Sequence, residues 1–258
     1  MENKILLSHG ELHIPCLINV PDDGDIRRIV LGVHGLGGGS GDQIQVNLAE
    51  EMEQFHSAAF RFDFPAHGEN PMSDEFFTVR HCMDSLITVA RYAREQYPQI
   101  EDLCIFATGF GAYITLIALS SLLEMPGRVK LVVQTPSVLM HDTLLTMLHT
   151  NKVTLRAMDK MSFNTRRPFG VTYDFYKELE RNIALTTHPI PMLILHGEED
   201  AYIRMSDIQN FRRINEQSKL VIIPGTSHRF LEEGAWDMVL DLTRDWFSFE
   251  QVILADWI

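Results

Sequence analysis

The sequence predicts an α/β fold with a mostly parallel central sheet flanked by helices, and three observations support this prediction. Apolar runs of strand length alternate with amphipathic segments of helix length along the 258-residue chain. The runs are apolar throughout, as strands covered by helices on both faces must be. The alternation has the spacing of parallel strand–helix–strand units, so the strands are expected to share one sheet.

The first half of the chain supplies these elements in regular order. Two short strands are expected near the N-terminus, and a third, continuous apolar strand stops at a glycine-rich loop, residues 35–41. Ile44, Leu48 and Met52 then recur on one helical face. The strands are predicted at residues 4–8, 12–20, 28–34, 58–64, 103–107 and 129–134, and the helices at 44–55, 79–97 and 112–123.

The interval between residues 136 and 189 breaks this rhythm. It is rich in methionine, leucine and phenylalanine and has a helical composition. We expect a helical cap insertion, about residues 138–188, folded over the carboxyl edge of the sheet, where ligand sites of open α/β sheets lie. An ordinary packed helix pair is the alternative. The chain, residues 1–258, is predicted to be one domain, completed by strands at 192–196 and 220–223 and helices at 206–216 and 235–247.

Composition narrows the classes of partner. The net charge of −13 argues against nucleic acid or an anionic membrane surface. No secretory signal or transmembrane run is apparent. Cys16, Cys82 and Cys104 are too few, and odd in number, for a disulfide framework, which favours a reducing, cytoplasmic setting. A small molecule is therefore the expected partner, and composition leaves the oligomeric state undetermined.

The most informative segment is CIFATGFGAY, residues 104–113, in which an apolar strand runs into a small-residue turn and then a helix. This pattern is similar to the nucleophile elbow G-x-S-x-G, whose outer positions must be small because the turn is sharp. Ala107 and Gly111 meet that need, and Gly109 occupies the nucleophile position without a side chain. A nucleotide-phosphate loop is the alternative, but the full G-x-G-x-x-G is missing and the strand is not the first.

Two other loops follow apolar strands and carry groups suited to the same chemistry. HGLGG, residues 34–38, has the character of a loop that points a backbone N–H at an oxyanion, with tight turning alone as the alternative. HGEED, residues 196–200, offers a carboxylate that can orient an imidazole. Asp200 is the preferred acid and Glu199 the second choice, while a solvated acidic loop is the competing interpretation.

A histidine completes the set. His228 ends the loop PGTSH, residues 224–228, after the last predicted strand, where it is placed to act as a base. A purely structural histidine is the alternative. The chain order of nucleophile position, acid and histidine is that of α/β hydrolases.

With these motifs the chain resembles the α/β-hydrolase superfamily over nearly its whole length. The segment RFDFPAHGEN, residues 61–70, strengthens the resemblance. Within the superfamily the chain is similar to small bacterial carboxylesterases, including cinnamoyl (feruloyl) esterases and monoacylglycerol-lipase-like proteins. The resemblance implies a serine-hydrolase mechanism on small apolar or aryl esters, without metal or cofactor. In it His228 is the base, Asp200 orients His228, and the N–H groups of Leu36 and Phe110 form the oxyanion hole.

Gly109 departs from this pattern because it has no side chain. Without a side-chain oxygen at the elbow, no acyl-enzyme forms. Thr108, Ser227 and Cys82 are the other side chains that offer a nucleophilic atom, and each has little to favour it. Three hypotheses remain open. The protein is a hydrolase of full or weak activity, a non-catalytic protein that binds a small ligand in the hydrolase pocket, or a variant whose serine has been replaced.

Overall fold

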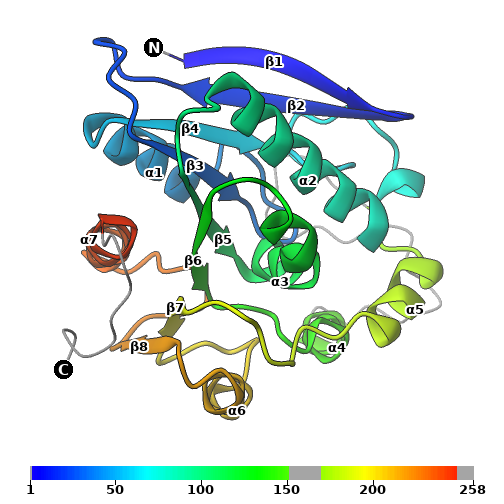
Figure 1. Cartoon of the computed structure of the whole chain (residues 1–258). Coiled ribbons are helices and arrows are strands. Elements are labelled where there is room, and N and C mark those ends of the chain that lie inside the picture. Colours follow the sequence, from blue (N-terminus) through cyan, green and yellow to red (C-terminus); the bar gives the residue numbers. More distant parts are fainter. Residues whose placement is uncertain (1, 151–169, 249–258) are drawn as a thin grey trace.

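One eight-stranded sheet forms the centre of the protein in the computed structural model, which describes residues 2–150 and 170–248 (Figure 1). The strands lie in the order β1-β2-β4-β3-β5-β6-β7-β8. Neighbours from β4 to β8 are parallel, and β1 and β2 join them antiparallel. The predicted mostly parallel sheet is confirmed. The strands are β1 Glu2–His9, β2 Leu12–Asn19, β3 Arg28–Val33, β4 Ser57–Phe62, β5 Asp102–Thr108, β6 Arg128–Gln134, β7 Met192–Gly197 and β8 Lys219–Ile223.

Helices cover both faces of the sheet, which explains why the strands are apolar throughout. On β5, Ile105 and Ala107 face the core beneath α2, α3 and α6, while Cys104 and Phe106 face the core beneath α1 and α7. The two cores thus take alternate residues of one strand. The helices are α1 Gln43–Gln54, α2 Val79–Gln96, α3 Gly109–Leu123, α4 Met140–Thr150, α5 Tyr173–Arg181, α6 Met205–Ile214 and α7 Ala235–Ser248, with a 3₁₀ turn at Asp74–Phe76.

The start of α3 differs from the prediction. The helix begins at Gly109, three residues before the predicted start at residue 112. Glycine has a low intrinsic helix propensity, so the sequence favoured a later start. The sharp turn that ends β5 uses the left-handed backbone of Gly109, with φ of +49°, as the first helical position.

Between β6 and β7 the chain forms α4 and α5, which contact each other. Residues 151–169 of the expected cap insertion lie outside the described residues, so its boundaries stay a prediction. Within the described part of the chain, no helix is long and apolar enough to cross a membrane. The parallel strands end at one edge of the sheet, and the loops after β3, β5, β7 and β8 therefore meet there.

Candidate active site

His228 and Asp200 are brought together at this edge. The carboxylate Oδ2 of Asp200 lies 2.8 Å from Nδ1 of His228. Its other oxygen, Oδ1, accepts the backbone N–H groups of Tyr202 and Ile203, at 2.8 and 3.0 Å. The Asp200 side chain is fully buried, whereas that of His228 keeps 19% of its surface exposed. A carboxylate held in this way fixes the orientation of the imidazole and leaves the other ring nitrogen toward the open side.

The electrostatics of the pair favour an ionised Asp200. Burial raises the pKa of Asp200, but the hydrogen bond from His228, the charge of that ring and the two backbone donors more than offset it. The pKa of Asp200 therefore lies below its ordinary value. The alternative acid, Glu199, is exposed, and its backbone N–H bonds the Thr226 carbonyl instead.

A glycine allows the acid and histidine loops to approach so closely. A Cβ on Gly197 would lie 2.5 Å from the carbonyl oxygen of Thr226 and 2.8 Å from that of Ser227. Any side chain at this position would push the two loops apart. Sequence reasoning missed this role of Gly197, and its place between a strand and the acid loop was the available signal.

Gly109 lies opposite the imidazole. A Cβ built on it would be 3.9 Å from Nε2 of His228. Within the described residues, that nitrogen is the only heavy atom within 4 Å, apart from the chain neighbours and the backbone of the same helix. The predicted nucleophile position thus faces the His228 imidazole across open space that a side chain does not fill.

Gly111, two residues further on, is needed for a different reason. A Cβ there would lie 2.3 Å from the carbonyl oxygen of His34 and 2.7 Å from that of Val33. The N-terminus of α3 packs directly on the end of β3 because this residue has no side chain. Ala107, the other small residue of the elbow, is fully buried in β5.

The loop after β3 is held by buried polar contacts. Nε2 of His34 accepts the backbone N–H of Phe64 at 3.1 Å, so the ring proton lies on Nδ1, which is 2.8 Å from the Gly35 carbonyl oxygen. Gly38 N–H donates to the same oxygen at 3.1 Å, closing a tight turn around Leu36. Phe110 is the second residue of α3, and backbone N–H groups at that helical position have no partner within the helix.

The buried carboxylate of Asp63 supports this loop from the neighbouring strand end. It accepts the backbone N–H of Ser40 at 2.6 Å and that of Glu69 at 2.9 Å. Both hydrogen bonds are accepted by a residue of the segment 61–70. They hold the loop after β4 against the glycine-rich loop.

The three other candidate nucleophiles are engaged or buried. Thr108 Oγ1 is directed at the Val33 carbonyl oxygen, 3.5 Å away. The side chain of Ser227 hydrogen bonds to Glu232 and lowers the pKa of that carboxyl. Cys82 is buried in α2, and burial raises the pKa of its thiol well above the ordinary value. None of the three is prepared to attack a substrate beside His228.

A second histidine, which sequence reasoning did not single out, lies beside the pair. His196 is buried at the end of β7, with Nδ1 3.9 Å from Asp200 Oδ2. Burial lowers the pKa of His196, more than the nearby carboxylate raises it, so the ring is neutral at pH 7. Burial also lowers the pKa of His188.

The lowered pKa values of His188 and His196 predict that the protein is less stable in mild acid. A folded-state pKa below the ordinary 6.5 means that the unfolded chain takes up protons first as the pH falls. The free energy of unfolding should therefore decrease from pH 7 to pH 5, as urea denaturation at a series of pH values will measure. His196→Gln should flatten this dependence, whereas His13→Gln, at an exposed position, should not. Parallel curves for the two variants would contradict the prediction.

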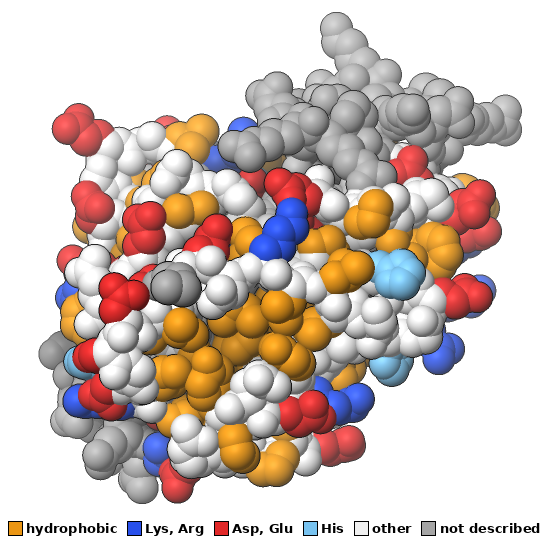
Figure 2. All heavy atoms as spheres, turned by 90° about the horizontal axis from the view of Figure 1, so that it is seen from above, with side chains coloured by type: hydrophobic (Ala, Val, Ile, Leu, Met, Phe, Trp, Pro, Cys, Tyr) orange, Lys and Arg blue, Asp and Glu red, His pale blue; other side chains and the backbone are white. Residues whose placement is uncertain are grey.

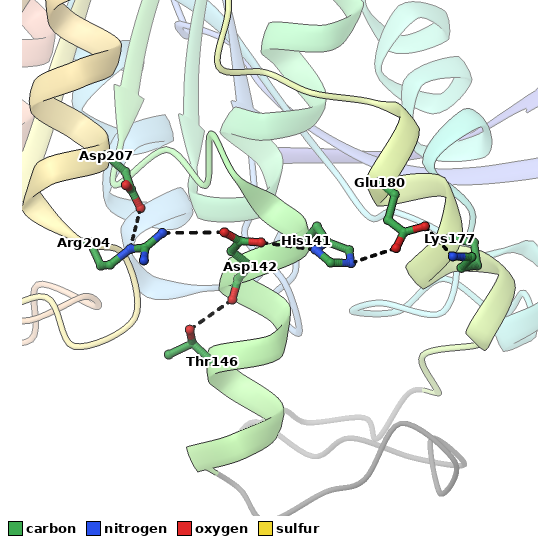
Figure 3. A network of polar contacts seen from close by, with 7 residues as sticks. All are labelled: His141, Asp142, Thr146, Lys177, Glu180, Arg204 and Asp207. Carbon is green, nitrogen blue, oxygen red and sulfur yellow. Dashed lines mark hydrogen bonds and ion pairs between the residues drawn. The ribbon is translucent and has the colours of Figure 1, made fainter.

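Ion pairs join the segments around the site (Figure 3). His141 of α4 lies 3.2 Å from Asp142 and 3.5 Å from Glu180 of α5. Arg204, which precedes α6, lies 3.6 Å from Asp142 and 2.9 Å from Asp207. The network thus connects α4 and α5 to the loop between β7 and α6, which contains Asp200.

We expect the pair of Arg204 and Asp142 to add little stability, because both side chains are exposed to solvent. In a double-mutant cycle of Asp142→Ala and Arg204→Ala, the coupling energy should be below about 1 kcal/mol. Chemical denaturation of the parent and the three variants measures it. A coupling energy well above that value would show that the pair is shielded from solvent.

The order of the strands and the arrangement of these loops define the fold class of the protein. The chain has the α/β-hydrolase fold, as solved structures with TM-scores above 0.7 show. A putative hydrolase from Agrobacterium vitis matches with a TM-score of 0.78 and 16% identity, covering 96% of this chain and 98% of its own. Est1E from Butyrivibrio proteoclasticus with bound ferulic acid matches with 0.76 and 15%, covering 93% and 96%. The mouse α/β hydrolase domain-containing protein 10 matches with 0.73 and 15%, covering 94% and 97%. No protein-family model and no curated protein sequence matches the chain.

Proposed function

We propose that this protein hydrolyses small carboxylic esters slowly, with water in place of a serine nucleophile. One observation carries the proposal. Asp200 holds His228 at 2.8 Å, and Nε2 of that ring faces the open space above Gly109. A partly exposed imidazole held by a buried carboxylate, beside an empty nucleophile position, suits general-base activation of a water molecule.

In the proposed reaction, Nε2 of His228 takes a proton from the water while its oxygen attacks the ester carbonyl carbon. The backbone N–H groups of Leu36 and Phe110 stabilise the oxyanion that forms. The bond to the alcohol oxygen then breaks, and His228 returns the proton to that oxygen. The products are a carboxylic acid and an alcohol, and no covalent intermediate forms on the protein.

One comparison supports small apolar or aryl esters as the substrate class. Est1E, which shares the fold, binds ferulic acid, an aryl carboxylic acid.

Ester hydrolysis by the parent chain tests the proposal. We expect a rate above the buffer background with nitrophenyl esters, because catalytic sites that lack a triad member keep about 10³–10⁴-fold acceleration over water. His228→Ala should abolish this rate and Asp200→Asn should lower it, while His13→Ala, at an exposed position on β2, should leave it intact. A rate that survives His228→Ala would falsify the proposed base.

A second candidate function is non-catalytic binding of a small aryl acid or ester. The observation that favours it is Gly109, together with the engaged or buried state of Thr108, Ser227 and Cys82. Under this function ferulate raises the melting temperature, and no ester in the panel is turned over faster than in buffer. Measurable His228-dependent turnover excludes it as the sole function.

A further inference from the structure

The strand β1 is an edge of the sheet with an open outer side. It pairs with β2 along its whole length, residue for residue and without a bulge, and no other described strand adjoins it. Half of its backbone N–H and C=O groups therefore point outward. Such an edge is a template for pairing with another strand.

The middle of this edge is apolar. Leu6 is 60% exposed on one face of β1, while Ile5 and Leu7 are half-buried on the other face, where α2 contacts the strand. Figure 2 looks onto the molecule from this side and shows apolar side chains gathered at the centre of the face, with charged groups mostly around them. An exposed apolar edge of this kind marks an interaction surface.

The usual protection against pairing is weak here. Natural edge strands carry lysine, proline or a bulge to prevent association. β1 contains no proline, and its one lysine, Lys4, forms an ion pair with Glu69. The carboxylate of Glu2 is paired with the buried Arg61. The charges on this strand are thus compensated within the chain.

We propose that β1 pairs antiparallel with β1 of a second copy of this chain, about a two-fold axis at Leu6. An axis perpendicular to the sheet keeps paired residues on the same face, so their numbers must add to an even sum. The register centred on Leu6 places apolar residues opposite one another and sets no like charges in opposition. Its pairs are Leu6 with Leu6, Ile5 with Leu7, Lys4 with Ser8, and Asn3 with His9.

The neighbouring registers fit less well. Centring the axis on Ile5 would place Lys4 opposite Leu6, and centring it on Leu7 would place Ile5 opposite His9. Each would set a polar side chain against an apolar one at the middle of the contact. Self-complementarity of the Leu6 register is what selects a second copy as the partner. This inference does not depend on the proposed hydrolytic function.

Cysteine cross-linking tests the register. In the proposed dimer the two Leu6 Cα atoms are about 4.5–5.5 Å apart, which suits a disulfide. Ser8 lies opposite Lys4 of the second copy, four residues away from that copy's Ser8. The two Ser8 Cα atoms are therefore about 14 Å apart, which is too far for a disulfide. Leu6→Cys should form a disulfide-linked dimer under mild oxidation and Ser8→Cys should not. The native cysteines are buried and should not interfere. Equal cross-linking of both variants, or of neither, overturns the register.

Sedimentation over a concentration series tests the dimer itself, at about 0.15 M salt so that the net charge is screened. The parent should dimerise reversibly, and Leu6→Lys should be a folded monomer, because it sets two positive charges together at the axis. Leu231→Lys is the matched control, since Leu231 is 61% exposed on the loop after β8, at the other end of the sheet. It should dimerise like the parent. A monomeric parent, or a Leu6→Lys variant that still dimerises, overturns the proposal. A monomeric parent includes the case in which β1 receives a strand of another protein.

Discussion

Gly109→Ser is expected to raise the rate of ester hydrolysis by about 10³-fold or more over the parent chain, because loss of a triad nucleophile costs about 10⁶-fold in kcat. The serine Cβ would lie 3.9 Å from His228 Nε2, which places the hydroxyl within reach of a hydrogen bond to the base. Steady-state assays with nitrophenyl esters measure the rate. A phosphonate probe specific for activated hydroxyls should label the variant and not the parent.

Gly109→Ala is the matched control for this experiment. It adds the same Cβ at the same left-handed backbone, φ +49°, without the hydroxyl. Both substitutions should lower the free energy of unfolding by about 1–2 kcal/mol, the cost of a side chain in that conformation. Only the serine variant should gain activity. A folded but inert Gly109→Ser protein would show that Asp200 and His228 are not arranged as a triad requires.

Gly111→Ala should destabilise the protein by about 3 kcal/mol, the largest stability effect that we predict. Its Cβ would lie 2.3 Å from the His34 carbonyl oxygen and 2.7 Å from that of Val33. Both atoms belong to the backbone of the sheet and the loop that follows it, so neither can move without separating α3 from β3. Chemical denaturation of the parent and the variant measures the difference in the free energy of unfolding.

Gly35→Ala supplies the contrast, since its Cβ would meet Thr108 Oγ1 at an ordinary 3.4 Å and Gly35 has no left-handed backbone. Its stability should stay within about 1 kcal/mol of the parent. If Gly111→Ala is no worse than Gly35→Ala, the close approach of α3 to β3 is not a constraint on the fold.

The sequence by itself predicted most of the fold because the relevant signals are local. A strand buried on both faces must be apolar at every residue, and β5 and β7 are recognisable on that ground alone. A sharp turn between strand and helix requires small residues, so Ala107, Gly109 and Gly111 indicate such a turn from the sequence alone. The chain order of Gly109, Asp200 and His228 then predicted the residues that the structure places at one edge of the sheet.

The tertiary structure decided what local patterns do not contain. Asp200 and Glu199 are adjacent and chemically alike, and only the turn after β7 buries one against His228 and exposes the other. The Ser227 side chain is adjacent in sequence to His228, yet it bonds Glu232. His196 lies near Asp200 because β7 ends there. These outcomes depend on how loops distant in sequence approach one another, and that approach is fixed by backbone contacts across the sheet edge, such as those that Gly197 permits.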